Sequence, residues 1–110
     1  MASTAGRQPS QAPAPYGVAK AGIIQLTRQV AQEAGPRGVR INCVSPSTIL
    51  TESNMARIPL EQQRALAGQY PLQRLGTPED VAQATLFLIS EQSSWLTGLI
   101  VDIAGGRNSF

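Results

Sequence analysis

The sequence of 110 residues contains no histidine and only one cysteine, Cys43. A single cysteine excludes a disulfide within the chain and is typical of a reducing compartment. The absence of histidine leaves almost no ligands for a structural zinc site. We therefore expect no metal site in this chain.

Long apolar runs and clusters of charge are missing as well. No segment approaches the roughly 20 apolar residues that a membrane span requires, and the amino terminus has no apolar run of the signal-peptide type. The nine lysines and arginines are scattered and the net charge is only +2, whereas a nucleic-acid-binding surface gathers its basic residues in a patch or stripe. We expect a cytoplasmic protein whose partners include neither a membrane nor a nucleic acid.

The residues that are present predict one globular α/β domain. Apolar residues make up 42% of the chain, and its length is close to the commonest domain size. Apolar positions three and four apart predict helices, and short β-branched runs predict strands. The predicted elements are, in order, the tail of a strand at 1–6, a helix at 16–34, a strand at 39–44, one or two short helices at 52–70, a helix at 78–90 and a strand at 99–103.

Local sequence marks two of the helix ends. Thr77 is a typical N-cap, and Pro78 suits the first position of the helix that follows it. At the end of the helix at 16–34, Gly35 is expected to supply a left-handed cap, and the proline after it blocks continuation. Arg74 is interpreted as a solvated surface arginine, although it could also pair with a nearby acid.

The alternation of strands and helices predicts a parallel sheet with right-handed crossovers. Such sheets bind ligands beyond the carboxyl ends of their strands. Ser3, Tyr16 and the loop Pro46–Thr51 all fall at that edge, although they lie on three separate segments of the chain. We therefore expect a functional site where these segments meet.

Tyr16 and Lys20 are spaced to lie on one face of a helix. A free tyrosine releases its proton only near pH 10, and a fixed positive charge nearby favours the phenolate. A tyrosine held beside a lysine can therefore exchange a proton with a substrate oxygen. For the pair alone, the alternative is a half-buried tyrosine next to a solvated lysine.

Five segments together resemble the short-chain dehydrogenase/reductase family, and they cover nearly the whole chain. Tyr16–Lys20 resembles the family's Tyr-x-x-x-Lys motif, and Ser3–Gly6 resembles its serine-bearing turn. Pro46–Thr51 resembles the Pro-Gly-x-x-x-Thr loop after the sixth strand. Pro71–Val81 is similar to the segment before the family's last helix, and Leu96–Gly106 to its last strand.

The resemblance implies a fold, a reaction and partners. The fold would be the carboxyl-terminal part of a Rossmann-like doubly wound parallel sheet, with about three strands and intervening helices. The activity would be an oxidoreductase that interconverts a hydroxyl and a carbonyl group of a small molecule, with NAD or NADP as its cofactor. The intact protein would be a homo-oligomer, and residues 52–76 would form a lid over the substrate.

The resemblance also implies roles for individual residues. Tyr16 would be the general acid or base, Lys20 would assist it and bind the nicotinamide ribose, and Ser3 would hold the substrate oxygen. The residues implied in cofactor binding are Tyr16, Lys20, Pro46, Ser47, Ile49 and Thr51. Two of these assignments have structural alternatives, because Ser3 could be a disordered terminal residue and Thr51 could be a helix cap.

Two departures from the family pattern bear on function. Ser47 stands where the family usually has glycine, and a Cβ there restricts the backbone and the approach of a ligand. The Gly-rich phosphate-binding turn and the residue that selects between NAD and NADP precede the catalytic serine in the family and are not in this sequence. We therefore interpret residues 1–110 as the carboxyl-terminal part of one dehydrogenase domain, inactive alone. The alternative is a non-enzymatic fragment that associates with a homologous subunit.

Overall fold

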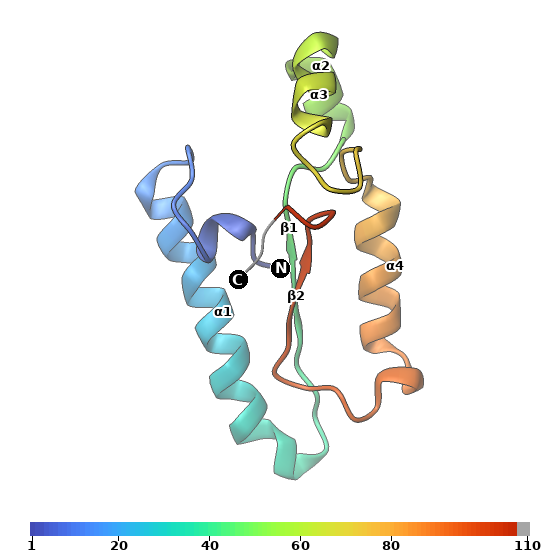
Figure 1. Cartoon of the computed structure of the whole chain (residues 1–110). Helices are drawn as coiled ribbons and strands as arrows, with labels where there is room; N and C mark the ends of the chain where they lie inside the picture. Colours follow the sequence, from blue (N-terminus) through green and yellow to red (C-terminus); the bar gives the residue numbers. More distant parts are fainter. Residues whose placement is uncertain (108–110) are drawn as a thin grey trace.

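The computed structural model describes residues 1–107, and Figure 1 shows how helices and strands alternate along the chain. The helices are α1 at Ala14–Ala34, α2 at Glu52–Arg57, α3 at Leu60–Ala67 and α4 at Pro78–Ile89, and the strands are β1 at Cys43–Pro46 and β2 at Ile100–Ile103. Three 3-10 turns lie at Thr4–Gly6 (η1), Gly35–Arg37 (η2) and Glu91–Ser93 (η3). Among the described residues, no helix is long and apolar enough to cross a membrane.

The two strands pair in parallel, with Cys43 opposite Ile100 and Pro46 opposite Ile103. Helices α1 and α4 lie on opposite sides of this pair (Figure 1), and α4 provides the crossover that parallel strands need. Helices on both faces of a parallel sheet define the doubly wound α/β arrangement. The predicted fold class is therefore confirmed.

The predicted strand tail at 1–6 is not a strand, and the strand predicted at 39–44 begins later than expected. The amide of Ala2 donates to the Val44 carbonyl at 2.9 Å, which is a single bond along the edge of β1, and the chain then turns into η1. The described residues thus contain two strands where about three were expected.

Side chains explain the late start of β1. The amide of Ile41 donates to the hydroxyl of Thr97 at 3.0 Å, and the Asn42 side-chain oxygen accepts from the amide of Leu99 at 3.0 Å. Together with one backbone bond, from the Gly98 amide to the Ile41 carbonyl at 2.7 Å, these bonds join the two segments irregularly, so regular pairing starts only at Cys43.

The core on the α1 side of the sheet is small and apolar. Ala2, Ile24 and Cys43 form its buried centre, with Ile23 and Ile100 packed against it. The lone cysteine is 3% exposed and lies in this cluster. Burial of these side chains holds the first residues of the chain against α1 and β1.

Gly35 is the C-cap of α1, as expected, but the left-handed glycine is Gly38, at the end of η2. Gly35 has helical angles, with φ −52°, and continues into η2, whereas Gly38 has φ +76° and is the left-handed residue. An α conformation immediately before proline crowds a Cβ against the proline ring. Glycine is therefore well suited to position 35, immediately before Pro36. The chain turns away from the helix three residues later, at Gly38.

Residues 52–70 form the two short helices α2 and α3, as predicted, and Figure 1 shows them beyond the carboxyl end of β1. Helix α4 begins as predicted. The Thr77 hydroxyl accepts from the Asp80 amide, the Asp80 carboxylate accepts from the Thr77 amide, and Pro78 is the first helical residue. This reciprocal pair of bonds is a capping box, which satisfies two of the free amides at a helix start.

Candidate active site

One cavity of about 380 Å³ brings together all of the residues for which a catalytic or cofactor-binding role was predicted. Its size is within the ordinary range of small-molecule sites. The predicted residues in its wall are Ser3, Tyr16, Lys20, Pro46, Ser47, Ile49 and Thr51, and the remaining wall residues are Met1, Ala2, Pro78 and Val81. The cavity lies where β1 ends, which is where ligands bind in parallel α/β sheets.

Tyr16 and Lys20 lie one helical turn apart at the start of α1. The Lys20 ammonium nitrogen is 5.4 Å from the centre of the Tyr16 ring, within the range of a cation–π contact. The same nitrogen donates to the Met1 carbonyl at 3.5 Å. Tyr16 is 44% exposed, so a ligand in the cavity has access to it.

Ser3 is held in a turn close to these two residues. Its hydroxyl oxygen accepts from the Ala5 amide at 3.3 Å and caps η1. The turn packs directly on α1, since a Cβ built on Gly6 would lie 2.7 Å from the backbone nitrogen of Ala21. On its other side, Arg7 forms an ion pair with Asp102 of β2 at 3.1 Å. The serine is therefore placed by packing and by an ion pair.

The loop Pro46–Thr51 is fixed by backbone bonds to the segment before α4. The amide of Leu50 donates to the Gly76 carbonyl at 2.8 Å, and the Gly76 amide donates to the Thr48 carbonyl at 3.1 Å. A Cβ on Gly76 would lie only 2.6 Å from Cδ1 of Ile49. The loop can approach so closely because residue 76 has no side chain.

Thr51 both caps a helix and lines the cavity. Its hydroxyl oxygen accepts from the Asn54 amide at 3.1 Å at the start of α2. The capping alternative for Thr51 is therefore confirmed, and the residue still belongs to the wall of the cavity. Its hydroxyl proton remains available to a ligand, because the oxygen acts as the acceptor in the cap.

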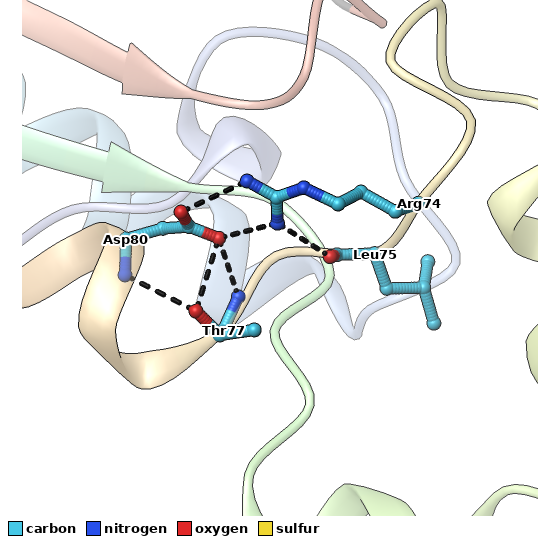
Figure 2. A network of polar contacts seen from close by, with 4 residues as sticks. All are labelled: Arg74, Leu75, Thr77 and Asp80. Atoms are coloured by element: carbon cyan, nitrogen blue, oxygen red, sulfur yellow. Dashed lines mark hydrogen bonds and ion pairs between the residues drawn. The ribbon is translucent and has the colours of Figure 1, made fainter.

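Arg74 is not simply solvated. Figure 2 shows its guanidinium paired with both oxygens of Asp80, at 2.6 and 3.0 Å. The same carboxylate accepts from the Thr77 amide at 2.8 Å. The Arg74 guanidinium, with that amide, holds the pKa of the Asp80 carboxyl well below its ordinary value of 3.8. This network fixes the first turn of α4, which contributes Pro78 and Val81 to the cavity.

Tyr70, within the segment 52–76 predicted as a lid, lies next to the cavity, and no individual role was predicted for it. It is 2% exposed, and its hydroxyl is hydrogen-bonded to the Ser47 hydroxyl at 2.8 Å and to the Thr48 amide at 3.3 Å. Arg107 donates to the same oxygen at 3.3 Å. Burial alone would raise the pKa of the phenol, but hydrogen bonds with these three neighbours lower it below 10.0. No local pattern marks this residue, since its partners come from distant parts of the chain.

No group of three or more potential metal-ligating side chains occurs among residues 1–107. The chemistry available in the cavity is that of hydroxyl groups, one ammonium group and backbone amides. These groups can bind and protonate an oxygen atom.

Comparisons with known proteins agree with this architecture. The family model described as Enoyl-(Acyl carrier protein) reductase matches residues 1–108. The chain is 40% identical over 94 residues to a 7alpha-hydroxysteroid dehydrogenase of Paraclostridium sordellii, covering 84% of this chain and 35% of that protein. It superposes on the crystal structure of a 3-oxoacyl-[acyl-carrier protein] reductase from Brucella melitensis ATCC 23457 with a TM-score of 0.90 and 35% identity, covering 98% of this chain and 41% of that one. A Brucella melitensis reductase of the same name with bound NAD gives a TM-score of 0.85 at 35% identity, covering 98% and 39%.

The parallel strands, the helices on both faces and the cavity beyond β1 define a Rossmann-like α/β protein. The chain belongs to the short-chain dehydrogenase/reductase family. It spans between 35% and 42% of the length of the curated relatives that it matches.

Proposed function

We propose that these 110 residues are the carboxyl-terminal part of a nicotinamide-dependent oxidoreductase that interconverts a hydroxyl and a carbonyl group of a small molecule. The observation that carries this proposal is the single cavity that holds Ser3, Tyr16 and Lys20 together with the Pro46–Thr51 loop. In the following, the intact enzyme means this chain joined to the nucleotide-binding half that its relatives possess.

Tyr16 would handle the proton. In the direction of carbonyl reduction, its hydroxyl would donate a proton to the carbonyl oxygen, and the Lys20 ammonium would stabilise the phenolate that remains. Ser3 would hold the same oxygen. Its hydroxyl oxygen already accepts from the Ala5 amide, so its own proton is available to the negative charge that develops on the substrate.

The wall of the cavity fits the nicotinamide end of the cofactor. Pro46, Ile49 and Val81 offer apolar contact to a flat ring, and Lys20 and Thr51 offer donors to ribose and phosphate oxygens. When bound, the cofactor supplies or accepts the hydride. The choice between NAD and NADP would be made by the other half of the enzyme.

The substrate-facing lid would be residues 52–76. Helices α2 and α3 lie beyond the carboxyl end of β1 (Figure 1), and loops at this edge commonly close over a bound substrate. Assembly into a homo-oligomer would cover apolar side chains that this chain leaves open. Val18 and Leu26 on α1 are 71% and 58% exposed, and Ile89 at the end of α4 is 72% exposed.

The test is Tyr16→Phe in the intact enzyme. Loss of the proton donor should lower kcat by about 10²- to 10⁴-fold, while the dissociation constant for NADH or NADPH changes by less than about threefold because the ring remains. Turnover is followed as loss of reduced-cofactor absorbance, and cofactor binding by fluorescence titration. Unchanged turnover would remove Tyr16 from the mechanism.

A further inference from the structure

A chain of two hydroxyl groups links a buried tyrosine to the cavity wall. Ser47 lines the cavity, and its hydroxyl oxygen is 2.8 Å from the hydroxyl oxygen of Tyr70. Tyr70 lies after α3, at the end of the lid segment, and is 2% exposed. The serine stands at the position where the family pattern has glycine, so this contact is an addition to that pattern.

The hydrogen-bond partners of the Tyr70 oxygen determine which of the two hydroxyl groups donates the bond between them. The Tyr70 oxygen accepts from the Thr48 amide and from the Arg107 guanidinium, each at 3.3 Å. Both of these partners are donors only. The Ser47 oxygen is the only one of the three partners that can accept the phenol proton, so Tyr70 donates to Ser47.

Because Ser47 accepts from Tyr70, its own proton is free to be donated elsewhere. Within residues 1–107, the Ser47 hydroxyl forms its hydrogen bond with Tyr70 alone. The guanidinium of Arg107, 5.2 Å from the Tyr70 ring centre and bonded to its oxygen, polarises the phenol and strengthens it as a donor. The result is a serine hydroxyl that accepts from Tyr70 with one of its two lone pairs and keeps its own proton for donation.

We propose that the Ser47 hydroxyl donates a hydrogen bond to a phosphate oxygen of the nicotinamide cofactor, and that Tyr70 is the positioning residue that orients it. An anionic acceptor suits this group because a hydrogen bond to a charged oxygen is about twice as strong as one between neutral groups. A glycine at position 47 has no such donor. The inference rests on the proposed function, since it assumes that this cavity takes a nicotinamide cofactor.

The first test measures the affinity of the intact enzyme for NADH by fluorescence titration. Ser47→Ala and Tyr70→Phe should each raise the dissociation constant about tenfold, as expected for the loss of one hydrogen bond to a charged group. The dissociation constant of the double variant should be within about twofold of that of either single variant, because both changes remove the same bond. In steady-state kinetics, both substitutions should raise the KM for the cofactor and leave kcat unchanged. Additive losses would overturn the proposal.

The control for these variants is Ser94→Ala. Ser94 is exposed and lies after η3, far along the chain from the loop. It should leave the NADH dissociation constant unchanged. An equal weakening by Ser94→Ala would mean that the Ser47→Ala effect is not specific to the cavity.

A second measurement identifies the acceptor. Nicotinamide mononucleotide contains a phosphate, and nicotinamide riboside does not. Ser47→Ala should therefore weaken competition by the mononucleotide about tenfold and leave competition by the riboside unchanged. Equal losses for the two ligands would overturn the assignment to phosphate.

A third measurement needs no cofactor. The Thr48 amide donates to the Tyr70 oxygen, so its hydrogen exchange in the cofactor-free enzyme should be faster in Tyr70→Phe than in Ser47→Ala. Equal exchange in the two variants would overturn the role of Tyr70. If the unmodified enzyme bound no nicotinamide cofactor while the exchange difference was present, the proposed function itself would fail, and the Ser47 role would fail with it.

Discussion

The two helices that border the candidate site begin in opposite ways. Helix α4 starts with a complete capping box between Thr77 and Asp80, and Arg74 adds an ion pair to it (Figure 2). Helix α1 starts at Ala14 after Pro13, which makes no side-chain cap, and its first turn contains no acid. One helix start is stabilised by its own sequence, and the other depends on what packs against it.

The two helix starts therefore have different roles: the start of α1 carries the proposed reacting groups, and the start of α4 contributes to stability. The first turns of α1 carry Tyr16 and Lys20 and are held by the close contact of η1, where Gly6 meets the backbone at Ala21. The first turn of α4 carries no proposed reacting group but places Pro78 in the cavity wall. Substitutions of Tyr16 or Lys20 should therefore change turnover with little effect on folding, and substitutions of Thr77 or Asp80 at the start of α4 should do the reverse.

The largest effect is expected for Lys20→Met in the intact enzyme. Lys20 is the only lysine of the chain, and its ammonium lies 5.4 Å from the Tyr16 ring centre. Loss of this charge should lower kcat/KM about 100-fold or more, because the phenolate loses its stabilising cation and the cofactor loses a donor. Steady-state kinetics measures the loss, and thermal unfolding should show a similar Tm for the two proteins.

The matched control is Arg28→Met, which removes an exposed cation from the same helix. It should leave kcat/KM within about twofold of the unmodified enzyme, since an exposed charge this far from the cavity is screened by solvent. Equal losses in the two variants would show that Lys20 acts through the net charge of α1 and not at the site.

The same contrast explains what the sequence could predict. The start of α4, the pair α2 and α3, and the strand at the carboxyl end are encoded by neighbouring residues, as in Thr77-Pro78, and all were found where expected. The strand starting at Cys43 was placed too early because the side chains of Asn42 and Thr97 interrupt the regular backbone ladder before it, where one backbone bond joins Gly98 to Ile41. The approach of the Ser3 turn to α1 follows from packing that no local pattern describes.

In the candidate site, sequence motifs predicted Ser3, Tyr16, Lys20 and four residues of the loop Pro46–Thr51, all of which line the cavity, but not the other wall residues, which are Met1, Ala2, Pro78 and Val81. They could not reveal the contacts between those residues and the rest of the chain. Pairing of Arg74 with an acid was one of two alternatives, and the sequence did not identify Asp80 as its partner because the shape of the intervening turn depends on the fold. Tyr70 is hydrogen-bonded to Ser47, which lies 23 residues earlier in the sequence, and to Arg107, which lies 37 residues later. Contacts of this kind depend on the folded arrangement and not on spacing.

A smaller effect is expected for Asp80→Asn. The change removes the negative partner of Arg74 and weakens the capping box of α4. The Thr77 hydroxyl still caps the helix, so the change costs up to about 1 kcal/mol for the weakened carboxylate half of the box and at most about 1 kcal/mol more for the ion pair at the surface. The free energy of unfolding should therefore fall by about 1–2 kcal/mol in urea denaturation, with kcat little changed.

The pH dependence of this variant gives a separate check. The folded state holds the pKa of Asp80 below its ordinary value of 3.8, so the carboxylate contributes its full stability above that value and loses it as the pH falls further. The difference in the free energy of unfolding between Asp80→Asn and the unmodified protein should become smaller below about pH 4. Glu79→Gln, in the same exposed turn, should change stability by less than about 0.5 kcal/mol. A difference that persists undiminished in acid would contradict the role of the ion pair.

The smallest effects are expected for glycines in and after α1, the helix whose start is uncapped. Gly22 lies within the helix, and a Cβ there meets nothing within 4 Å, so Gly22→Ala should stabilise the protein by about 0.5–1 kcal/mol. Gly38 also has open space around it, but its φ is +76°. Gly38→Ala should therefore destabilise the protein by about 1–2 kcal/mol, which is the cost of a left-handed backbone for a residue with a Cβ. Urea denaturation of the two variants compares the same added methyl group in two backbone conformations. Stabilisation by both variants would contradict the left-handed backbone conformation of Gly38 at the end of η2.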